Sequence, residues 1–196
     1  MQATAELHER AARVFSALRH RAESDPAATS AFPDDWFDLG SEHYADMGAM
    51  FYLASMTPYH RPRSLAAAVA SIEPALRLGQ YRIFRSQGFP RAFISWAGLD
   101  PVRERRFAID HAALLPEDWN SGPSVWLVDF VAPFGHMDEI VAELPKNQEL
   151  TRLRALWHDR KGEGYRVIEW TRQLPGGVVR QRSFSPAAFA RHLERG

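Results

Sequence analysis

The sequence predicts an α/β protein with a mixed sheet, and three features of its pattern indicate this class. Apolar residues recur at helical spacing through most of the first 80 residues. Apolar segments then flank a glycine-containing loop at 86–91, which is typical of a β-hairpin. Residues 125–131 are apolar on both faces around Asp129, as in a central strand that is covered on each side. Helices combined with these strands predict helices packed against a sheet.

The first part of the chain is predicted to be helical. Residues 5–23 carry apolar side chains at helical spacing, and a loop rich in Ala, Ser, Pro and Asp follows them. A second helix is expected over 41–55, and it must end near Thr57 because the residue before a proline disfavours the α region. A third helix is expected over 64–78, where Pro74 should end or kink it.

The second part is predicted to contain most of the sheet. Residues 81–85 and 92–96 form the hairpin, and the strand around Asp129 should end at Pro133 and Gly135. The remaining expected elements are an arginine-rich helix over 101–109, a helix around 136–144, strands near 151–157 and over 165–171, and a carboxy-terminal helix from about 186.

Composition excludes several function classes. Asp plus Glu and Lys plus Arg number 24 each, so no overall field attracts nucleic acid or a membrane surface. The absence of cysteine removes disulfides, thiolate metal sites and an acyl-cysteine intermediate. The first ten residues lack the apolar core of a signal peptide, and no stretch approaches the roughly 20 apolar residues of a membrane span. A cytoplasmic protein is therefore expected.

Asp129 raises a specific question, because an ionised carboxylate inside a buried strand needs a cation or hydrogen-bond donors. Any arginine could supply that cation and form a structural ion pair with Asp129. Of the eight histidines, His60 has the best local case. It lies in M-T-P-Y-H-R-P-R between two helices, where Pro58 and Pro62 restrict the loop and hold an imidazole at a fixed angle. A His60–Asp129 pair would suit a general base, because the carboxylate fixes the tautomer of the ring.

Other catalytic patterns are absent from the sequence. No serine lies in a G-x-S-x-G elbow, and no histidine or carboxylate spacing indicates a metal site, so no metal is predicted. The segment D-R-K-G-E-G at 159–164 superficially resembles the pyrophosphate loop of acetyl-CoA-dependent acetyltransferases. Asp159 stands where that loop has Arg or Gln, so a hairpin turn is the favoured interpretation.

Several stretches, in order over residues 47–171, resemble the lysine acyltransferases that activate RTX toxins. They include M-G-A-M-F-Y-L-A-S-M-T-P-Y-H-R, L-R-L-G-Q-Y-R-I-F-R and F-P-R-A-F-I-S-W-A. The most specific is L-P-E-D-W-N-S-G-P-S-V-W-L-V-D-F-V-A-P-F-G, and R-V-I-E-W fits more loosely. The resemblance implies a GNAT-like acyltransferase fold, with a mixed, mostly antiparallel central sheet flanked by helices. It also implies that His60 and Asp129 are the catalytic pair.

The resemblance further implies a homodimer that binds no cofactor and uses an acylated acyl carrier protein as its donor. The acceptor would be a lysine of an RTX-type protein, whose amine, with a pKa near 10.4, must lose its proton before it attacks the thioester. Thr57 stands where the family often has serine, which suits turn geometry or a hydrogen bond. Arg61 is a candidate for contact with an acidic carrier, as are Arg63, Arg82, Arg85 and the arginines of 103–106. Trp126, with Trp96 and Trp119, could line an acyl channel, although core packing is the simpler role.

Three points stay open at the level of sequence. Residues 1–38 have no counterpart in the family pattern and are expected to be a helical extension to an acyltransferase-like domain over 39–196. The R-P-R-S-L that follows His60 departs from the family pattern and leaves the acyl chain and the target protein open. An acyl-CoA-dependent transferase acting on a small amine, or a non-catalytic chaperone of a secreted partner, are the alternative functions.

Overall fold

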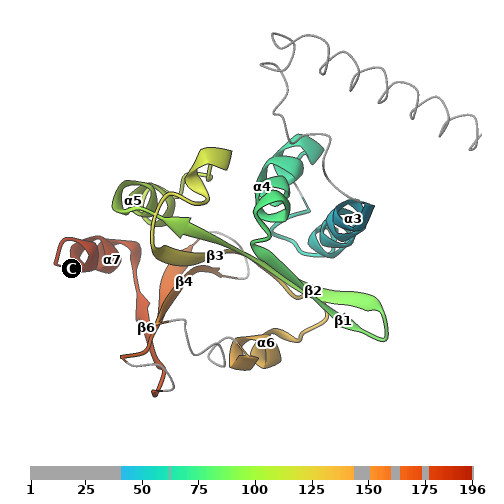
Figure 1. Ribbon diagram of the computed structural model, residues 1–196. Helices are drawn as coiled ribbons and strands as arrows, with labels where there is room; N and C mark the ends of the chain where they lie inside the picture. Colours follow the sequence, from blue (N-terminus) through green and yellow to red (C-terminus); the bar gives the residue numbers. More distant parts are fainter. Residues whose placement is uncertain (1–40, 62, 144–150, 160–163, 174–176, 196) are drawn as a thin grey trace, which may run out of the picture. The chain divides into compact units, whose positions relative to one another are not determined.

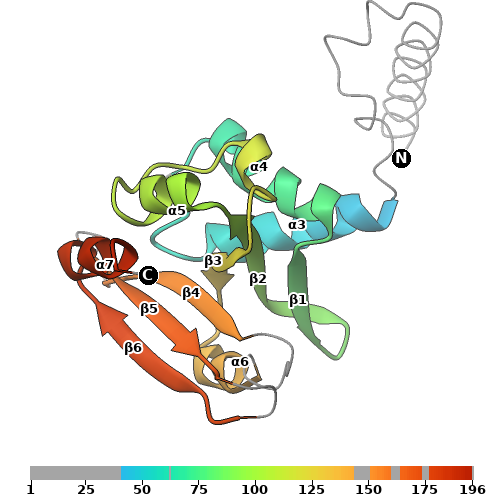
Figure 2. The same cartoon turned by 60° about the vertical axis from the view of Figure 1, so that its left-hand side comes forward.

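Within the described part of the chain, six strands form a single sheet in the order β1-β2-β3-β4-β5-β6. Its strands are β1 (Tyr81–Ser86), β2 (Phe89–Leu99), β3 (Ser124–Val131), β4 (Arg152–His158), β5 (Tyr165–Thr171) and β6 (Arg180–Phe184). Neighbouring strands are antiparallel except β3 and β4, which are parallel (Figures 1 and 2). The predicted mixed, mostly antiparallel sheet is confirmed, and the strand that carries Asp129 is central as expected.

The computed structural model describes residues 41–61, 63–143, 151–159, 164–173 and 177–195. Residues from Ala45 onward form one compact unit. The helix predicted over 5–23, the extension over 1–38 and the restraint expected from Pro62 lie outside the described residues. No helix among the described residues is long and apolar enough to cross a membrane.

Helices cover both faces of the sheet. The described helices are α3 (Ser41–Ser55), α4 (Leu65–Leu78), α5 (Pro101–Ala108), the 3₁₀ turn η1 (Pro116–Asp118), α6 (Met137–Glu143) and α7 (Pro186–Leu193). On one face, Met50 and Leu53 of α3 and Leu76 of α4 pack against Phe93 and Val131. On the other face, Ile140 of α6 packs against β2, β3 and β4 (Figures 1 and 2).

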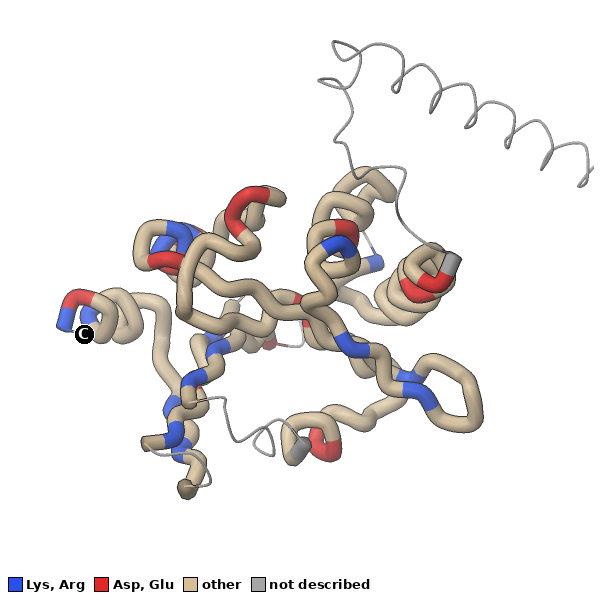
Figure 3. Tube along the Cα trace, in the orientation of Figure 1, with Lys and Arg blue, Asp and Glu red and all other residues tan. Residues whose placement is uncertain are grey.

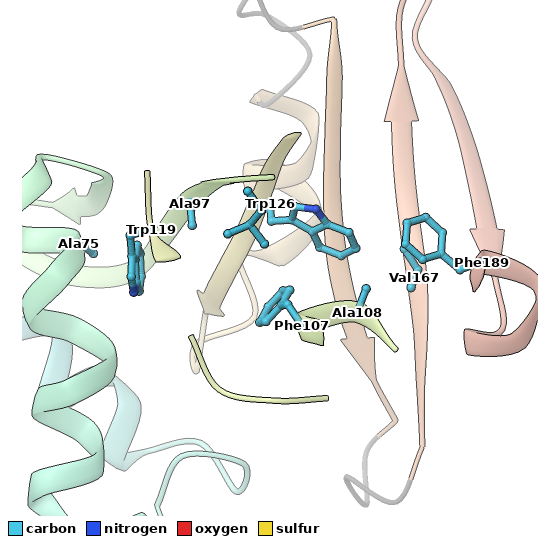
Figure 4. Close-up of a cluster of buried hydrophobic side chains, with 9 residues drawn as sticks. Ala75, Ala97, Phe107, Ala108, Trp119, Trp126, Val167 and Phe189 are labelled. Carbon is cyan, nitrogen blue, oxygen red and sulfur yellow. The ribbon is translucent and has the colours of Figure 1, made fainter. Parts of the chain in front are cut away.

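A second part of the core joins α5 and α7 to the centre of the sheet. Figure 4 shows the indole of Trp126 between Phe107 of α5 and Phe189 of α7. The three rings meet edge to face, with centroids 5.5 and 5.7 Å apart. Because Trp126 is completely buried, this contact fixes β3 against two helices from distant parts of the chain.

One expectation about an element was wrong in part, and one strand was not predicted. Pro74 does not end its helix, because α4 begins after the Ser64 N-cap and continues through Pro74 to Leu78, with Gly79, whose φ is 65°, as its C-cap. Pro74 is buried with Ala75 and Leu76, so core packing retains the helix despite the missing N–H donor. Strand β6 was not predicted, because its residues R-Q-R-S-F are mostly exposed and polar and give no apolar alternation.

A β-bulge in β3 decides which face receives Asp129. Trp96 pairs with Leu127 and Ser95 pairs with Asp129, so Val128 is the extra residue on β3. Leu127 packs on the α6 face, whereas Val131 packs on the α3–α4 face. Alternation without a bulge would place Leu127, Asp129 and Val131 on the same face of the sheet. The bulge thus turns Asp129 toward the segment that joins α3 to α4.

Candidate active site

His60 lies in the short connection between α3 and α4, where backbone hydrogen bonds fix its position. The amide of His60 donates to the carbonyl of Thr57 at 3.3 Å, and the amide of Arg61 donates to the same carbonyl at 3.0 Å. The carbonyl of His60 accepts from the amide of Arg63 at 3.0 Å. These successive turns form where Pro58 prevents α3 from continuing through Thr57. The histidine is therefore carried by a constrained turn at the end of a helix.

The structure brings the two predicted catalytic residues together. Nε2 of His60 lies 3.0 Å from Oδ1 of Asp129, across 69 positions of sequence. The side chains of His60 and Asp129 are only 12% and 5% exposed. An ionised Asp129 can only accept, so Nε2 carries the hydrogen of this bond. The basic nitrogen of the neutral ring is then Nδ1.

Ser95 completes the surroundings of Asp129 and was not predicted. Its hydroxyl donates to Oδ2 of Asp129 at 3.2 Å and accepts from the backbone amide of Asp129 at 3.1 Å. Both contacts follow from the bulge, which pairs Ser95 directly with Asp129 on the neighbouring strand. The buried carboxylate thus has a hydrogen bond to each oxygen, which answers the question that the sequence raised. The only sequence signal was a serine within an otherwise apolar strand.

Thr57 occupies the other side of the imidazole. Its hydroxyl oxygen lies 2.8 Å from Nδ1 of His60 and 2.9 Å from the carbonyl oxygen of Ala54. With a neutral ring, the hydroxyl donates to Nδ1. With an imidazolium, Nδ1 donates to the hydroxyl, which then donates to Ala54. A single rotation of the hydroxyl therefore satisfies both protonation states of His60.

An aromatic ring next to His60 connects it to two further histidines. The ring of Tyr59 meets His60 edge to face at 4.9 Å and stacks on His158 at 4.6 Å between centroids. The guanidinium carbon of Arg63 lies 4.9 Å from the centroid of Tyr59. Nε2 of His158 lies 2.9 Å from Nε2 of His111. Spacing in the sequence gave no sign of this grouping, because its members come from three separate segments: the α3–α4 connection, the loop after α5 and the end of β4.

The other predicted contact residues lie in different settings. Trp126 is in the core, and its indole N–H donates to Glu104 at 2.8 Å, so its position favours core packing over an acyl channel. Arg61 is exposed in the turn that carries His60. Among the other arginines, Arg85 pairs with Asp46, and Arg103 and Arg106 both pair with Asp118. The described residues contain no group of three or more His, Cys, Asp or Glu side chains that could hold a metal ion.

The 159–164 segment supports the hairpin interpretation at its two described ends. His158 pairs with Tyr165 in the antiparallel β4–β5 ladder. The amide of Asp159 donates to the carbonyl of Gly164 at 2.9 Å, and the amide of Gly164 donates to the carboxylate of Asp159 at 3.1 Å. Residues 160–163 lie outside the described part of the chain. The segment therefore joins two antiparallel strands.

Comparison with known proteins identifies relatives along most of the described chain. The leukotoxin-activating lysine-acyltransferase of Aggregatibacter actinomycetemcomitans is 36% identical over 96 residues, which cover 49% of this chain and 57% of that protein. The RTX-I toxin-activating lysine-acyltransferase of Actinobacillus pleuropneumoniae is 33% identical over 148 residues, or 76% of this chain and 84% of that protein. A protein-lysine myristoyltransferase of Escherichia coli is 29% identical over 140 residues, or 69% and 82%.

The family comparison covers the elements that build the site. The model of the RTX toxin acyltransferase family matches residues 41–171, which include α3, the His60 turn, the Asp129 strand and both strands of the β4–β5 hairpin. The chain belongs to the RTX toxin acyltransferase family.

Proposed function

We propose that this protein transfers a fatty acyl group from an acylated acyl carrier protein to a lysine side chain of an RTX-type protein. The observation that carries the proposal is the buried His60–Asp129 pair, with the Thr57 hydroxyl on the free side of the ring. Relatives that share this region are named as toxin-activating lysine acyltransferases, and one as a myristoyltransferase. These names support an RTX-type acceptor and a long acyl chain.

The geometry supports general-base catalysis by His60. As the lysine amine attacks the thioester carbonyl, the N–H proton moves to Nδ1 of His60, either directly or through the Thr57 hydroxyl. Asp129 keeps the proton on Nε2 and stabilises the imidazolium that forms, as a carboxylate does in a catalytic triad. When the tetrahedral intermediate collapses, the C–S bond breaks and His60 returns its proton to the leaving thiolate. The products are the amide and the free thiol.

The separation of β3 from β4 beyond their short paired stretch supports a site for the donor thioester next to the His60 and Asp129 side chains. The parallel register of the two strands comprises only Trp126–Arg154 and Leu127–Ala155. Strand β3 continues to Val131 and β4 to His158, so Asp129 lies beyond the paired stretch. Backbone groups of strands that have separated can bind an extended ligand between them. The thioester arm of an acyl carrier protein is such a ligand, and Asp129 would lie beside it.

An acidic carrier protein should dock where basic side chains surround the entrance to the site. Arg61 follows His60 directly and is exposed, Arg63 is half-buried three positions after His60, and Arg82 is exposed on β1. Figure 3 shows further basic positions along β4, β5 and β6. The carboxylate pairs of Arg85, Arg103 and Arg106 make these residues weaker candidates. A homodimer and a cytoplasmic location remain predictions from the sequence.

A donor-competition experiment tests the proposal against an acyl-CoA-dependent transferase. Purified protein is incubated with full-length RTX-I protoxin or leukotoxin protoxin, and with myristoyl-acyl carrier protein or myristoyl-CoA. We expect a myristoyl mass increment on lysine with the carrier-bound donor and at least tenfold slower reaction with the CoA donor. Faster transfer from CoA would favour the alternative enzyme. Tight binding of protoxin with no mass increment from either donor would favour the chaperone.

A further inference from the structure

A pair of histidines next to His60 has no role in the mechanism given so far. His158 is the last residue of β4, and His111 follows α5 in a loop, with a φ of 54°. Their Nε2 atoms lie 2.9 Å apart. Tyr59 stacks on His158, and Tyr165 stacks on His111 with centroids 4.7 Å apart. The two rings are thus held between aromatic side chains in a defined hydrogen-bonding arrangement.

Tyr165 also fixes the chain that leads to His111. Its hydroxyl donates to the carbonyl oxygens of Ala108 at 3.0 Å and Ile109 at 3.2 Å. Burial, followed by the charge of Asp110, raises the pKa of Tyr165, so the phenol stays protonated and retains this donor. The position of His111 therefore depends on a partly buried contact between the Tyr165 hydroxyl and the backbone as well as on ring stacking.

The hydrogen bond between the two Nε2 atoms limits how many protons the pair can hold. One nitrogen must donate and the other must accept, so only one proton lies between them. The bond persists when the pair is neutral and when it carries one additional proton. A second additional proton would place N–H donors on both Nε2 atoms and break it. The pair can therefore accept one proton and release it without losing its structure.

The surroundings favour a neutral His158. Burial lowers its pKa most, followed by the charges of His111 and Arg63, while Asp159 acts in the opposite direction and His60 again lowers it. These are the charged groups that face the pair from the β4–β5 turn, the α3–α4 connection and the loop after α5. At neutral pH the imidazole is therefore unprotonated and able to accept a proton.

The proposed reaction needs a second proton acceptor. A lysine ammonium ion and a thioester give an amide, a thiol and one free proton. His60 takes a proton from the attacking nitrogen but returns it to the thiolate, so it releases none. The free proton is the one that the ammonium ion loses before attack, because only the neutral amine is a nucleophile. Water must take that proton unless another base lies nearby.

We propose that His158, supported by His111, is this acceptor for the substrate ammonium ion. The proposal rests on the lysine acyltransferase function proposed above. One N–H bond of the ammonium breaks, its electron pair stays on nitrogen, and the proton binds Nδ1 of His158. The Nε2 proton of His158 then passes to Nε2 of His111, and Nδ1 of the exposed His111 releases a proton to water. Tyr59, which contacts both imidazoles, places this pair one ring away from His60.

The test is the pH dependence of single-turnover acylation of full-length protoxin by myristoyl-acyl carrier protein, with His158→Asn and His111→Asn. His136→Asn changes an exposed histidine just before α6 and serves as the matched control. We expect His158→Asn to slow acylation at pH 7 by about 100-fold, within the usual range for loss of an acid–base group. The deficit should shrink steadily toward pH 10, where the lysine loses its proton to solvent, and His111→Asn should show the same trend with a smaller deficit.

A substrate amine that is less basic than lysine distinguishes proton acceptance by His158 from a purely structural role. Replacing the target lysine of the protoxin by thialysine, whose amine is more acidic, should restore much of the activity of His158→Asn at pH 7. A deficit that is equal at every pH and for both amines, or a profile that overlays the wild type, would overturn the proposal. His111→Asn provides the same test if His158→Asn fails to fold. Absence of acylation by the wild type would instead overturn the proposed function itself.

Discussion

The hydroxyl oxygen of Thr57 lies 2.8 Å from Nδ1 of His60, on the nitrogen that Asp129 does not contact. Asp129 is therefore on the Nε2 side, and in the proposed mechanism the substrate proton reaches Nδ1, the nitrogen beside which Thr57 lies. The same hydroxyl lies 2.9 Å from the carbonyl of Ala54 at the end of α3. This carbonyl gives the hydroxyl a second acceptor when Nδ1 becomes protonated.

Thr57→Val removes this hydroxyl while keeping a β-branched side chain of similar shape. We expect the acylation rate to fall about 10- to 100-fold, because the valine leaves Nδ1 of His60 without a partner in either protonation state. Thr57→Ser keeps the hydroxyl and should stay within about threefold of wild type. Single-turnover rates measured by mass spectrometry compare the variants. Equal rates for Val and Ser would show that the hydroxyl has no part in the reaction.

Ser95→Ala should lower the free energy of unfolding by about 1–3 kcal/mol, the usual cost of leaving buried polar groups unpaired. The variant removes a donor from Oδ2 of Asp129 and the acceptor of its backbone amide. Ser86→Ala, at an exposed position of β1, is the matched control and should change stability by less than about 0.5 kcal/mol. Urea denaturation measures both. If Ser95→Ala is as stable as its control, Asp129 does not depend on the serine.

Arg154 of β4 pairs with two buried carboxylates. Its guanidinium pairs with Glu104 of α5 and with Glu169 of β5, and all three side chains are at least nine-tenths buried. Arg154→Met would leave two carboxylates buried without their cation, so we expect a loss of about 3–5 kcal/mol in the free energy of unfolding. Arg152→Met, on the same strand but exposed, should be nearly neutral. If the two variants have the same denaturant midpoint, the predicted role of Arg154 is wrong.

The lowered pKa of His158 predicts a loss of stability in acid. A histidine whose pKa is lower in the folded than in the unfolded protein binds fewer protons when folded. The free energy of unfolding must then decrease as the pH falls below about 6.5, the value for an unfolded histidine. His158→Asn should show a smaller decrease between pH 7 and pH 5 than wild type in urea denaturation. An identical slope in both proteins would mean that His158 contributes no such term.

Local signals in the sequence predicted the sheet apart from β6 and made His60 a candidate partner of Asp129, and the family resemblance then selected this pair. Prolines around His60 mark a constrained turn, and an aspartate in an apolar strand requires a partner. The bulge at Val128 leaves no such signal, because it depends on how β2 and β3 align. Without the bulge, neither the face of Asp129 nor its contact with Ser95 could be predicted.

The His111–His158 contact could not be predicted either, because it also depends on the tertiary structure. The two residues lie 47 positions apart and meet through Nε2 atoms that only the fold brings together. Pro74 is the opposite case: its local signal predicted the end of a helix, but burial in the core keeps α4 continuous. Contacts that depend on tertiary alignment are therefore the part of this site that sequence alone does not provide.

The central claim is that His60 and Asp129 act together in lysine acylation. The most direct measurement is intact and peptide mass spectrometry of an RTX protoxin co-expressed with wild type, His60→Ala or Asp129→Asn. The account predicts a fatty-acyl increment on lysine with wild type, none with His60→Ala and a strongly reduced one with Asp129→Asn. Full acylation by His60→Ala would contradict the assignment of the base.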